Sequence, residues 1–432
     1  MEYFHSVTLN KDNCKGCTNC IKYCPTEAIR VKDGKAKIIN ERCIDCGECI
    51  RRCPYQAKKA VTDSLDLLDN FAFKIAIPAP AFYGQFNNVT INRILNSLYS
   101  LGFDYVYEVA RGAELVSEIV KEELASGNLK KPVISSACPA VVRLIQVRFP
   151  DLLGHVLRID SPMELAASLA KQKISQEKNI PLEKIGVFFI SPCAAKVTSV
   201  KSPLGRKKSR VDGVFSIADI FGKVYNNLRK IDEEKDLQCA SGIGIGWAVS
   251  GGEALALNIE DYLAVDGSEQ VIKVLEQIEM GRLAHIEFFE GQACVGGCVG
   301  GPLTVENSFI ARKRIRHLVN KMDKESKEIK KGITPELWQK IKEEAHWTEM
   351  INPREIMKLD EDRVRALEKI NLLEKIYKSL PGLDCGACGA PTCRALAEDI
   401  VRGWGNEYDC IFRLREELKN LALHLIQRTN GK

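Results

Sequence analysis

The 17 cysteines of this 432-residue chain constrain its fold more than any other feature, because they occur in tight groups separated by long stretches with few cysteines. A small secreted protein held together by disulfides spreads its cysteines through a short chain. Grouped thiols instead favour metal ligation in a reducing compartment, where thiols stay free and an odd count needs no pairing. The sequence therefore predicts a cytoplasmic metalloprotein.

The composition sets outer limits on the fold and the partners. Hydrophobic residues make up 45% of the chain, which is enough for large cores, and the length predicts two or three domains. The 62 Lys and Arg residues nearly balance the 57 Asp and Glu residues, so neither nucleic acid nor a membrane is expected as a partner. Residues 1–11 are polar and lack the apolar core of a signal peptide, and no apolar stretch approaches the ~18–20 residues of a membrane span.

Residues 1–62 form a predicted domain with two cysteine runs of identical spacing, C-x2-C-x2-C-x3-C-P. The first run is Cys14, Cys17, Cys20 and Cys24, and the second is Cys43, Cys46, Cys49 and Cys53. The spacing resembles that of bacterial ferredoxins with two [4Fe-4S] clusters, in which each run gives three ligands to one cluster and the fourth to the other. This resemblance implies that Cys53 completes the first cluster and Cys24 the second. Zinc fits poorly, since a zinc site needs only four ligands.

Residues 63–308 have the pattern of an α/β domain. Apolar, β-rich runs at 73–77 and 186–190 alternate with helical patterns such as 113–125. Four cysteines lie in three separate loops of this domain, namely Cys138, Cys193, Cys294 and Cys298. Two of the loops follow predicted strands, where a rigid scaffold commonly presents active-site residues. Glycines beside Cys298 would let the backbone approach a bulky inorganic ligand closely.

The three loops read SSACP around Cys138, SPCAAK around Cys193, and ACVGGC at Cys294 and Cys298. Together with the ferredoxin-like runs, they resemble the [FeFe]-hydrogenases over about residues 1–305. The resemblance implies that these four cysteines hold a [4Fe-4S] cluster, which Cys298 bridges to a two-iron subsite with CO, cyanide and dithiolate ligands to form the H-cluster. It also implies that Lys196 binds a cyanide ligand. The segments implied to line the subsite are Ala79-Pro80 and Ser161-Pro162.

The expected proton route of that family is largely missing. Ala137 replaces the cysteine that passes the final proton to the dithiolate. The positions aligned with the remaining relay groups hold Val120, Leu157 and Glu123. Apolar replacements break the hydrogen-bonded chain that proton transfer requires. Glu253 and Glu290 are candidate substitutes, although a surface or ion-paired carboxylate is the more favoured interpretation of each.

Two further replacements concern the surroundings of the implied subsite. Ser191 and Gln292 stand where the family has methionines that pack on the two irons. Their polar groups could hydrogen-bond the diatomic ligands and change the redox potential. Together with Ala137, they predict a slow hydrogenase with an altered potential, and the pattern resembles the sensory branch of the family, group D. Cys239 lies outside every group and is expected to be an inert thiol.

The C-terminal part contains a last cysteine group after a Lys- and Glu-rich stretch. Residues 309–380 are predicted to be a helical connector and residues 381–432 a C-terminal iron–sulfur domain with an amphipathic helix at 411–427. The ligands of a further [4Fe-4S] cluster would be Cys385, Cys388, Cys393 and Cys410, with zinc as a competitor. This domain would serve either as a second electron port or as an output module read by a partner.

The sequence thus predicts an α/β protein with an N-terminal bacterial ferredoxin-like domain, a hydrogenase-like α/β domain with mixed sheets flanked by helices, and a C-terminal helical Fe-S domain. The predicted function is the reversible interconversion of H2 with protons and electrons at an H-cluster, slow and serving H2 or redox sensing. The alternative is a non-catalytic iron–sulfur electron-transfer or scaffold protein without the two-iron subsite. Expected cofactors are three [4Fe-4S] clusters besides the H-cluster. Expected partners are H2, protons, a redox partner such as ferredoxin or a signalling protein, and a second copy in a homodimer.

Overall fold

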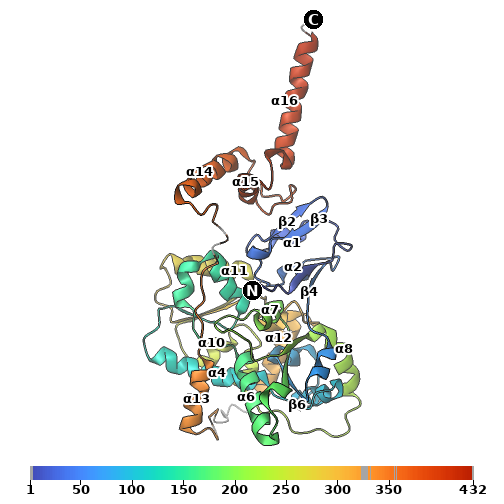
Figure 1. Cartoon of the computed structure of the whole chain (residues 1–432), viewed down its shortest axis with the longest axis vertical. Helices are drawn as coiled ribbons and strands as arrows, with labels where there is room; N and C mark the ends of the chain where they lie inside the picture. The colour runs from blue at the N-terminus through green and yellow to red at the C-terminus, as the bar shows by residue number, and fades with distance from the viewer. Residues whose placement is uncertain (1–2, 323–328, 331, 355, 357, 431–432) are drawn as a thin grey trace. The chain divides into compact units, whose positions relative to one another are not determined.

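The computed structural model describes residues 3–322, 329–330, 332–354, 356 and 358–430, which form two compact units (Figure 1). The larger unit is built from Met1–Val7, Ile44–Gly47 and Ala60–Arg354. The smaller unit is built from Thr8–Cys43, Glu48–Lys59 and Glu355–Lys432. Residues 309–354 of the predicted connector therefore belong to the larger unit, and the C-terminal residues share a unit with most of the first 59 residues.

The larger unit contains a four-stranded parallel sheet. Its strand order is β6 (Tyr105–Val106), β5 (Phe73–Pro78), β8 (Ile185–Ser191) and β9 (Gly213–Ser216). The predicted strands at 73–77 and 186–190 are confirmed, and they pair in register from Phe73 opposite Ile185 to Pro78 opposite Ile190. Alternate residues of β5 enter two different cores, Ala76 on one face and Ile75 with Ile77 on the other. Both faces are covered, which explains the continuous apolar runs.

A second sheet of the same unit has three parallel strands. Its order is β10 (Tyr262–Asp266), β11 (Phe288–Gln292) and β7 (Val133–Ile134). The predicted α/β class is confirmed. The described strands of both sheets run parallel, however, where the sequence predicts mixed sheets. Parallel pairing follows from the chain path, since a segment with at least one helix joins each strand of a pair to the next.

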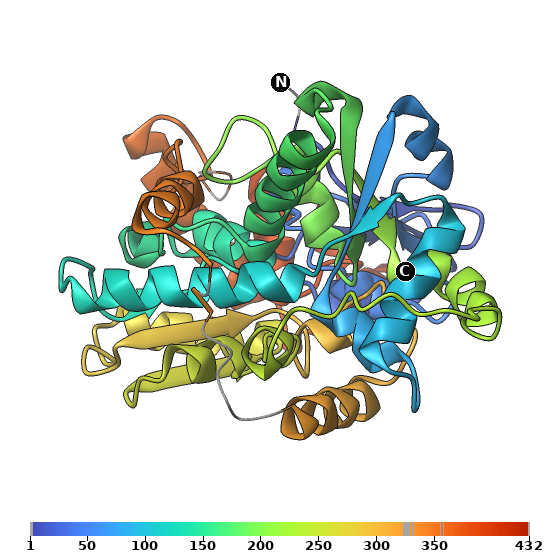
Figure 2. The ribbon, with the colours of Figure 1, turned by 90° about the horizontal axis from the view of Figure 1, so that it is seen from below.

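Eleven helices in the described part of the larger unit surround the sheets, and α4 packs against α6 (Figure 2). They are α3 (Ile91–Ser97), α4 (Val109–Ala125), α5 (Pro139–Arg148), α6 (Pro162–Lys178), α7 (Ala194–Lys201), α8 (Ile217–Leu228), α9 (Gly242–Gly246), α10 (Gly252–Leu257), α11 (Ser268–Glu279), α12 (Ser308–Lys321) and α13 (Pro335–Ala345). Short 3-10 helices in this unit are η2 (Leu65–Asn70), η3 (Pro80–Gln85), η4 (Leu98–Leu101), η5 (Pro150–His155), η6 (Leu182–Lys184) and η7 (Cys298–Gly300).

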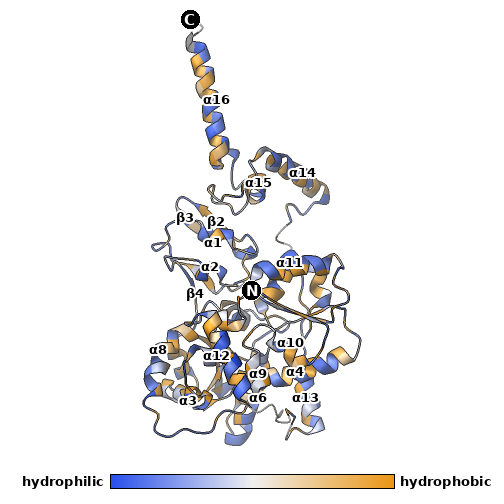
Figure 3. Cartoon of the chain, turned by 180° about the vertical axis from the view of Figure 1, so that it is seen from behind, coloured by the Kyte–Doolittle hydropathy of each residue, from blue (hydrophilic) through white to orange (hydrophobic). Residues whose placement is uncertain are grey.

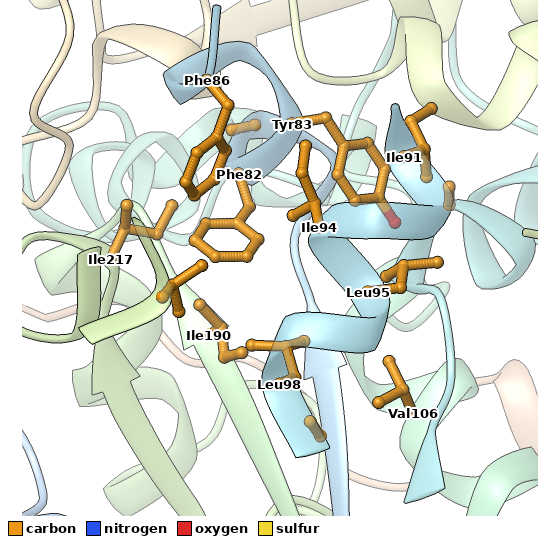
Figure 4. Packing of buried hydrophobic residues seen from close by; sticks show 14 of the residues in the cluster. Phe82, Tyr83, Phe86, Ile91, Ile94, Leu95, Leu98, Val106, Ile190 and Ile217 are labelled. Atoms are coloured by element: carbon orange, nitrogen blue, oxygen red, sulfur yellow. The ribbon is translucent and has the colours of Figure 1, made fainter. Parts of the chain in front are cut away.

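The largest core of this unit lies between the four-stranded sheet, η3 and α3 (Figure 4). Phe82 of η3 packs in it with Ile94 and Leu98, and Ile190 of β8 lies in the same cluster. Helix α12 contributes Ala311 and Ile315, both fully buried, although its other residues are mostly Lys, Arg and polar side chains. This helix is therefore part of the hydrogenase-like body.

The smaller unit combines short strands with the C-terminal helices. Antiparallel β2 (Ile29–Lys32) and β3 (Lys35–Ile38) form a hairpin, and β1 (Val7–Leu9) pairs with β4 (Lys58–Ala60). The helices here are α1 (Asn19–Lys22), α2 (Glu48–Arg51), α14 (Arg363–Ser379), α15 (Cys393–Val401) and α16 (Ile411–Asn430), with η1 (Asn40–Arg42) and η8 (Glu407–Asp409). The predicted C-terminal helix is confirmed, and Figure 3 shows hydrophobic residues along α16. No helix among the described residues is long and apolar enough to cross a membrane.

Candidate metal centres and active site

The three cysteine loops of the larger unit meet where parallel strands end. Cys138 follows β7, Cys193 follows β8, and Cys294 follows β11. Parallel sheets commonly bind ligands at this carboxyl edge. Cys138 and Cys193 are also the residues that directly precede helices α5 and α7. The positive ends of those helices favour thiolates or an anionic cluster at this place.

One cavity, with about 860 Å³ of space counting its open mouth, collects most of the site residues predicted in the α/β domain. Those in its wall are Ala79, Pro80, Ala137, Cys138, Pro162, Cys193, Lys196, Gln292, Cys294 and Cys298. Sequence reasoning did not identify Ser135, Met163 and Trp247, which also line it. The wall is mainly apolar, so the few polar groups in it determine what it can bind.

Two predicted residues do not line this cavity. Ser191 is fully buried, and its hydroxyl accepts a hydrogen bond from the Cys193 N–H (3.0 Å) and donates one to the Cys193 carbonyl (3.1 Å). It therefore fixes the cysteine loop instead of facing the cavity. Ser161 precedes α6 and lines a smaller neighbouring cavity, whose wall also includes Lys196.

The groups in the cavity wall fit an iron–sulfur centre. Four thiols provide the soft donors that such clusters need. The side-chain oxygen of Gln292 is buried and has no hydrogen-bond partner among the described residues. Gly297 has φ +92°, and a Cβ there would lie 2.6 Å from that oxygen and 2.5 Å from the Ser250 nitrogen. Backbone thus approaches the site at a distance that only glycine allows.

The charges at the site also suit an anionic group. Removal from water lowers the pKa of Lys196, while the thiols of Cys298 and Cys193 act in the opposite direction. The Lys196 ammonium group has no hydrogen-bond partner in the part of the chain that the structure describes. In the metal-free protein, burial raises the pKa of Cys193 to about 12. An anionic ligand beside Lys196 would give the ammonium group the partner that it lacks.

Glu253 and Glu290 lie beside the cavity and are buried, with 3% and 0% exposure. The Ser135 hydroxyl donates to a Glu253 oxygen (2.6 Å) and accepts from the Ala137 N–H (3.1 Å). Glu290 accepts hydrogen bonds from the Gly251 and Ala254 N–H groups (3.0 and 2.9 Å) and from the Gln292 amide (3.0 Å). Neither glutamate forms an ion pair among the described residues. The interpretation of these two residues as surface or ion-paired carboxylates is therefore wrong.

Burial raises the pKa of both glutamates. Desolvation, followed by the neighbouring Glu290 carboxylate, raises the pKa of Glu253 to about 8. Desolvation also raises the pKa of Glu290 to about 7, although backbone N–H donors oppose it. Glu253 lines the cavity. A carboxyl group that changes protonation near neutral pH at the cavity wall suits proton exchange.

The positions aligned with the family's proton relay cannot take the place of the Glu253 and Glu290 carboxyl groups. Val120 and Leu157 are buried in an apolar cluster with Trp247. Glu123 forms a hydrogen bond with His346 Nε2 (3.1 Å). Among these three positions, the structure therefore offers no hydrogen-bonded chain toward the cavity.

In the smaller unit, the structure brings together cysteines from both ferredoxin-like runs. Cys14, Cys17, Cys20 and Cys53 line a second cavity of about 340 Å³ of space. This is the set that the ferredoxin spacing implies for one cluster. Three cysteine sulfurs accept backbone N–H hydrogen bonds, Cys14 from Ala36 (3.3 Å), Cys24 from Ala28 (3.2 Å) and Cys53 from Ala57 (3.2 Å). Such hydrogen bonds to sulfur adjust cluster potentials.

The C-terminal cysteines form a third group in the same unit. Cys393 begins α15, and Cys410 directly precedes α16. Both are buried in the small core that also contains Leu373, Ile376 and Leu396. Burial raises the pKa of Cys388, and the thiols of Cys410 and Cys385 add to this rise. Cys388 therefore lies near Cys385 and Cys410, and Cys393 shares the small core with Cys388 and Cys410.

The fold and the thiol groups define an iron–sulfur protein of the hydrogenase type. A profile described as the C-terminal domain of the iron-only hydrogenase large subunit matches residues 73–261 and 253–302, together more than half of the chain. The chain therefore belongs to this family. A 4Fe-4S dicluster domain matches residues 6–54, and a profile described as an Fe-S cluster domain matches residues 380–412.

Individual relatives include both enzymes and an assembly factor. The NADP-reducing hydrogenase subunit HndD of Solidesulfovibrio fructosivorans is 23% identical over 67% of this chain and 55% of its own length, so the chain spans about half of HndD. The periplasmic [Fe] hydrogenase large subunit of Nitratidesulfovibrio vulgaris is 26% identical over 69% of this chain and 86% of its own. The cytosolic Fe-S cluster assembly factor nar1 of Aspergillus terreus is 25% identical over 40% of this chain and 31% of its own length.

A solved structure confirms the fold. A single-residue variant of [FeFe]-hydrogenase HydA1 from Chlamydomonas reinhardtii superposes with a TM-score of 0.52 at 16% identity. The match covers 68% of this chain and 98% of that protein. The hydrogenase-like fold predicted from the cysteine loops is therefore confirmed.

Proposed function

We propose that the protein is an [FeFe]-hydrogenase that interconverts H2 with protons and electrons, works slowly, and reports H2 or redox state to a partner. The observation that carries this proposal is the cavity itself. Its wall holds four thiols and continues beyond them to Lys196, Ala137 and Gln292, so it has the donors for a cluster and further space next to an ammonium group. A structural [4Fe-4S] cluster alone would not use the part of the cavity beside Lys196, Ala137 and Gln292.

In this proposal, the residues of the chain hold the cofactor and handle protons. Cys138, Cys193, Cys294 and Cys298 hold the H-cluster, which when bound supplies the metal centre at which H2 is split or formed. Lys196 pairs with an anionic ligand of the two-iron subsite. The Gln292 oxygen is poised to accept a hydrogen bond at the same place.

Glu253 takes over the proton exchange that Ala137 cannot perform. It lines the cavity, it is bonded to the Ser135 hydroxyl, and its pKa allows it to hold a proton at neutral pH and release it to Glu290 or water. A route built on two coupled carboxyl groups, with no thiol next to the subsite, supports slow turnover. Slow turnover suits a sensor better than bulk hydrogen metabolism. The expected partner is a ferredoxin or a signalling protein in the cytoplasm, where free thiols persist.

The decisive experiment is infrared spectroscopy of protein matured anaerobically with the two-iron cofactor, combined with a test of H2 formation from a strong reductant. The proposal expects CO and CN stretching bands together with measurable H2. The second candidate is a non-catalytic iron–sulfur protein, which the similarity to the assembly factor nar1 favours. Absence of those bands and of H2 would reject the hydrogenase and leave the second candidate.

A further inference from the structure

Two pairs of buried charges join the C-terminal cysteine domain to the ferredoxin-like domain within the smaller unit. The Arg30 guanidinium donates to both carboxylate oxygens of Asp399, at 2.6 Å and 3.0 Å. Arg42 pairs with both oxygens of the neighbouring Glu398. In each pair, both side chains are less than one tenth exposed. Arg30 lies on β2 and Arg42 on η1, whereas both carboxylates lie on α15, which begins at Cys393.

These pairs orient the C-terminal domain more than they stabilise it. Removing two charges from water costs several kcal/mol per ion, and only excellent geometry offsets that cost. Arg30 satisfies the condition, because its planar group bonds both oxygens of one carboxylate. Two adjacent carboxylates bound to arginines of different elements fix both the position and the rotation of α15. An interface that only kept the two domains together would not need two buried ion pairs of this geometry.

The cysteine loop itself touches the ferredoxin-like domain through glycines. The carbonyl of Gly389, which follows Cys388, accepts a hydrogen bond from the Val31 N–H (2.8 Å). Gly389 has φ +83°, and a Cβ there would lie 1.7 Å from the Val31 oxygen. Gly386, which follows Cys385, would place a Cβ 3.3 Å from Ile21 Cδ1. Ile21 directly follows Cys20 on α1.

These contacts bring the backbone of one predicted cluster loop close to elements of the other predicted cluster domain. The loop with Cys385 and Cys388 rests on β2 and on the helix that carries Cys20, and at both of these contacts the residue that the loop contributes is a glycine. Short separations through packed protein favour electron exchange, and a rigid attachment keeps the separation constant. The attachment is rigid here, because the ion pairs and the backbone hydrogen bond act on the same short segment.

We propose that the site formed by Cys385, Cys388, Cys393 and Cys410 is the electron port of this protein, held on the ferredoxin-like domain by the Arg30–Asp399 and Arg42–Glu398 pairs. In the direction of H2 uptake, H2 yields two protons and two electrons. Each electron passes by way of the ferredoxin-like sites to the C-terminal site, and from there to an acceptor protein that takes one electron at a time. Evolution of H2 reverses the path. The H2 part of this inference rests on the proposed function, whereas the coupling of the sites does not.

The main test uses Gly389→Ala in the full chain with its iron–sulfur clusters reconstituted. The matched control is Gly403→Ala in the same domain, because Gly403 also has positive φ (+76°) but has no atom within 4 Å of an added Cβ. We expect electron paramagnetic resonance of the reduced native protein and of Gly403→Ala to show magnetic coupling of the C-terminal cluster to the others. Gly389→Ala should lose that coupling at equal iron content. Coupling that is unchanged in Gly389→Ala would overturn the proposal.

A functional readout separates the port from the active site. Exchange of H2 with D2O needs no external acceptor, whereas H2-driven reduction of a bacterial two-cluster ferredoxin does. We expect Gly389→Ala to keep the exchange rate within twofold and to lose at least tenfold in ferredoxin reduction. Equal ferredoxin reduction in Gly389→Ala and the control would overturn the port. Absence of H2/D2O exchange in the native protein would instead reject the proposed function, and the magnetic coupling would still decide the inference.

A second variant keeps the test decisive if Gly389→Ala binds less iron. The double substitution Asp399→Asn with Glu398→Gln removes both buried carboxylate charges without changing the cysteine loop. Its control is Glu374→Gln, which removes the exposed partner of Arg394 in the same domain. We expect the double variant to weaken the magnetic coupling and the control to retain it. Full coupling in the double variant would show that the pairs do not hold the port.

Discussion

Replacing Glu253 by Gln tests the proton route most directly. The substitution keeps an oxygen that can accept the hydrogen bond from Ser135, but it removes the exchangeable acid. Burial raises the pKa of Glu253 from its ordinary 4.5 to about 8. At pH 7, an ordinary glutamate is protonated in about one molecule in 300, whereas a group with a pKa near 8 is protonated in about nine of ten. The native protein therefore keeps a filled proton donor at the cavity wall.

Loss of a positioned acid or base costs roughly 100-fold or more in rate. We expect Glu253→Gln to lose at least that factor in H2 evolution, and to lose the inflection near pH 8 in the native pH–rate profile. The assay is H2 evolution from a reduced mediator between pH 6 and 9, with the CO and CN infrared bands recorded on the same samples. Glu123→Gln is the matched control, because it makes the same change at the aligned relay position, where the carboxylate bonds His346. Unchanged turnover in Glu253→Gln, with intact infrared bands, would refute the route.

The remaining predictions concern the cofactor and the other groups beside the cavity. Ala137→Cys should raise turnover, measured as H2 evolution per H-cluster, and an unchanged rate would mean that loss of the other relay groups limits the reaction. Lys196→Met should remove the two-iron subsite but keep the cubic clusters, so iron analysis should fall by about two per chain and the CO bands should vanish. Fully loaded native protein should contain about 18 iron atoms per chain, and about 16 would indicate four cubic clusters alone. Because the pKa of Glu290 is raised to about 7, its contribution to stability is complete below pH 4.5 and is lost as the pH rises toward 7. Glu290→Gln should flatten that decline by up to about 1.4 kcal/mol per pH unit, which thermal unfolding at pH 5 and pH 7 can check.

The sequence predicts those parts of the site that depend on local spacing. Two of the three cysteine loops can be predicted to follow strands because an apolar run ends a few residues before the cysteine, and a parallel sheet brings such ends to one edge. The strands β5 and β8 can be predicted from the sequence because both of their faces are buried, which gives them continuous apolar runs. The burial of helix α12 cannot be predicted in this way. Only two of its residues, Ala311 and Ile315, are buried, and its many charged residues are typical of a helix on the surface.

Contacts between residues that are far apart in the chain cannot be predicted from the sequence, because they depend on how the elements pack. Ser135 and Glu253 are 118 residues apart, and their hydrogen bond depends on the packing of α10 beside the end of β7. The residues next to Glu253 in the sequence do not indicate that it is buried, since glutamates on protein surfaces also follow glycines. From the sequence, Gly389 is likewise predicted only to be a loop residue. The structure shows that the Val31 backbone leaves no space for a side chain at this position.

The buried carboxylates of the two units differ in one respect that decides what they can do. Glu398 is about as buried as Glu253, and burial alone would raise the pKa of both. Burial raises the pKa of Glu398, but the Arg42 and Arg402 guanidinium groups together outweigh it and lower the pKa, so this group stays ionised and can only hold α15 in place. Beside Glu253, burial and the Glu290 carboxylate outweigh the Ser135 hydroxyl and the Lys196 ammonium group, so the proton stays on Glu253 up to a pKa of about 8. A cation in direct contact with Glu253, as Arg42 is with Glu398, would keep the carboxyl group ionised and end proton exchange. Glu253 has no such ion pair among the described residues, and we therefore propose this carboxyl group, not one of the paired ones, as the replacement for the thiol missing at Ala137.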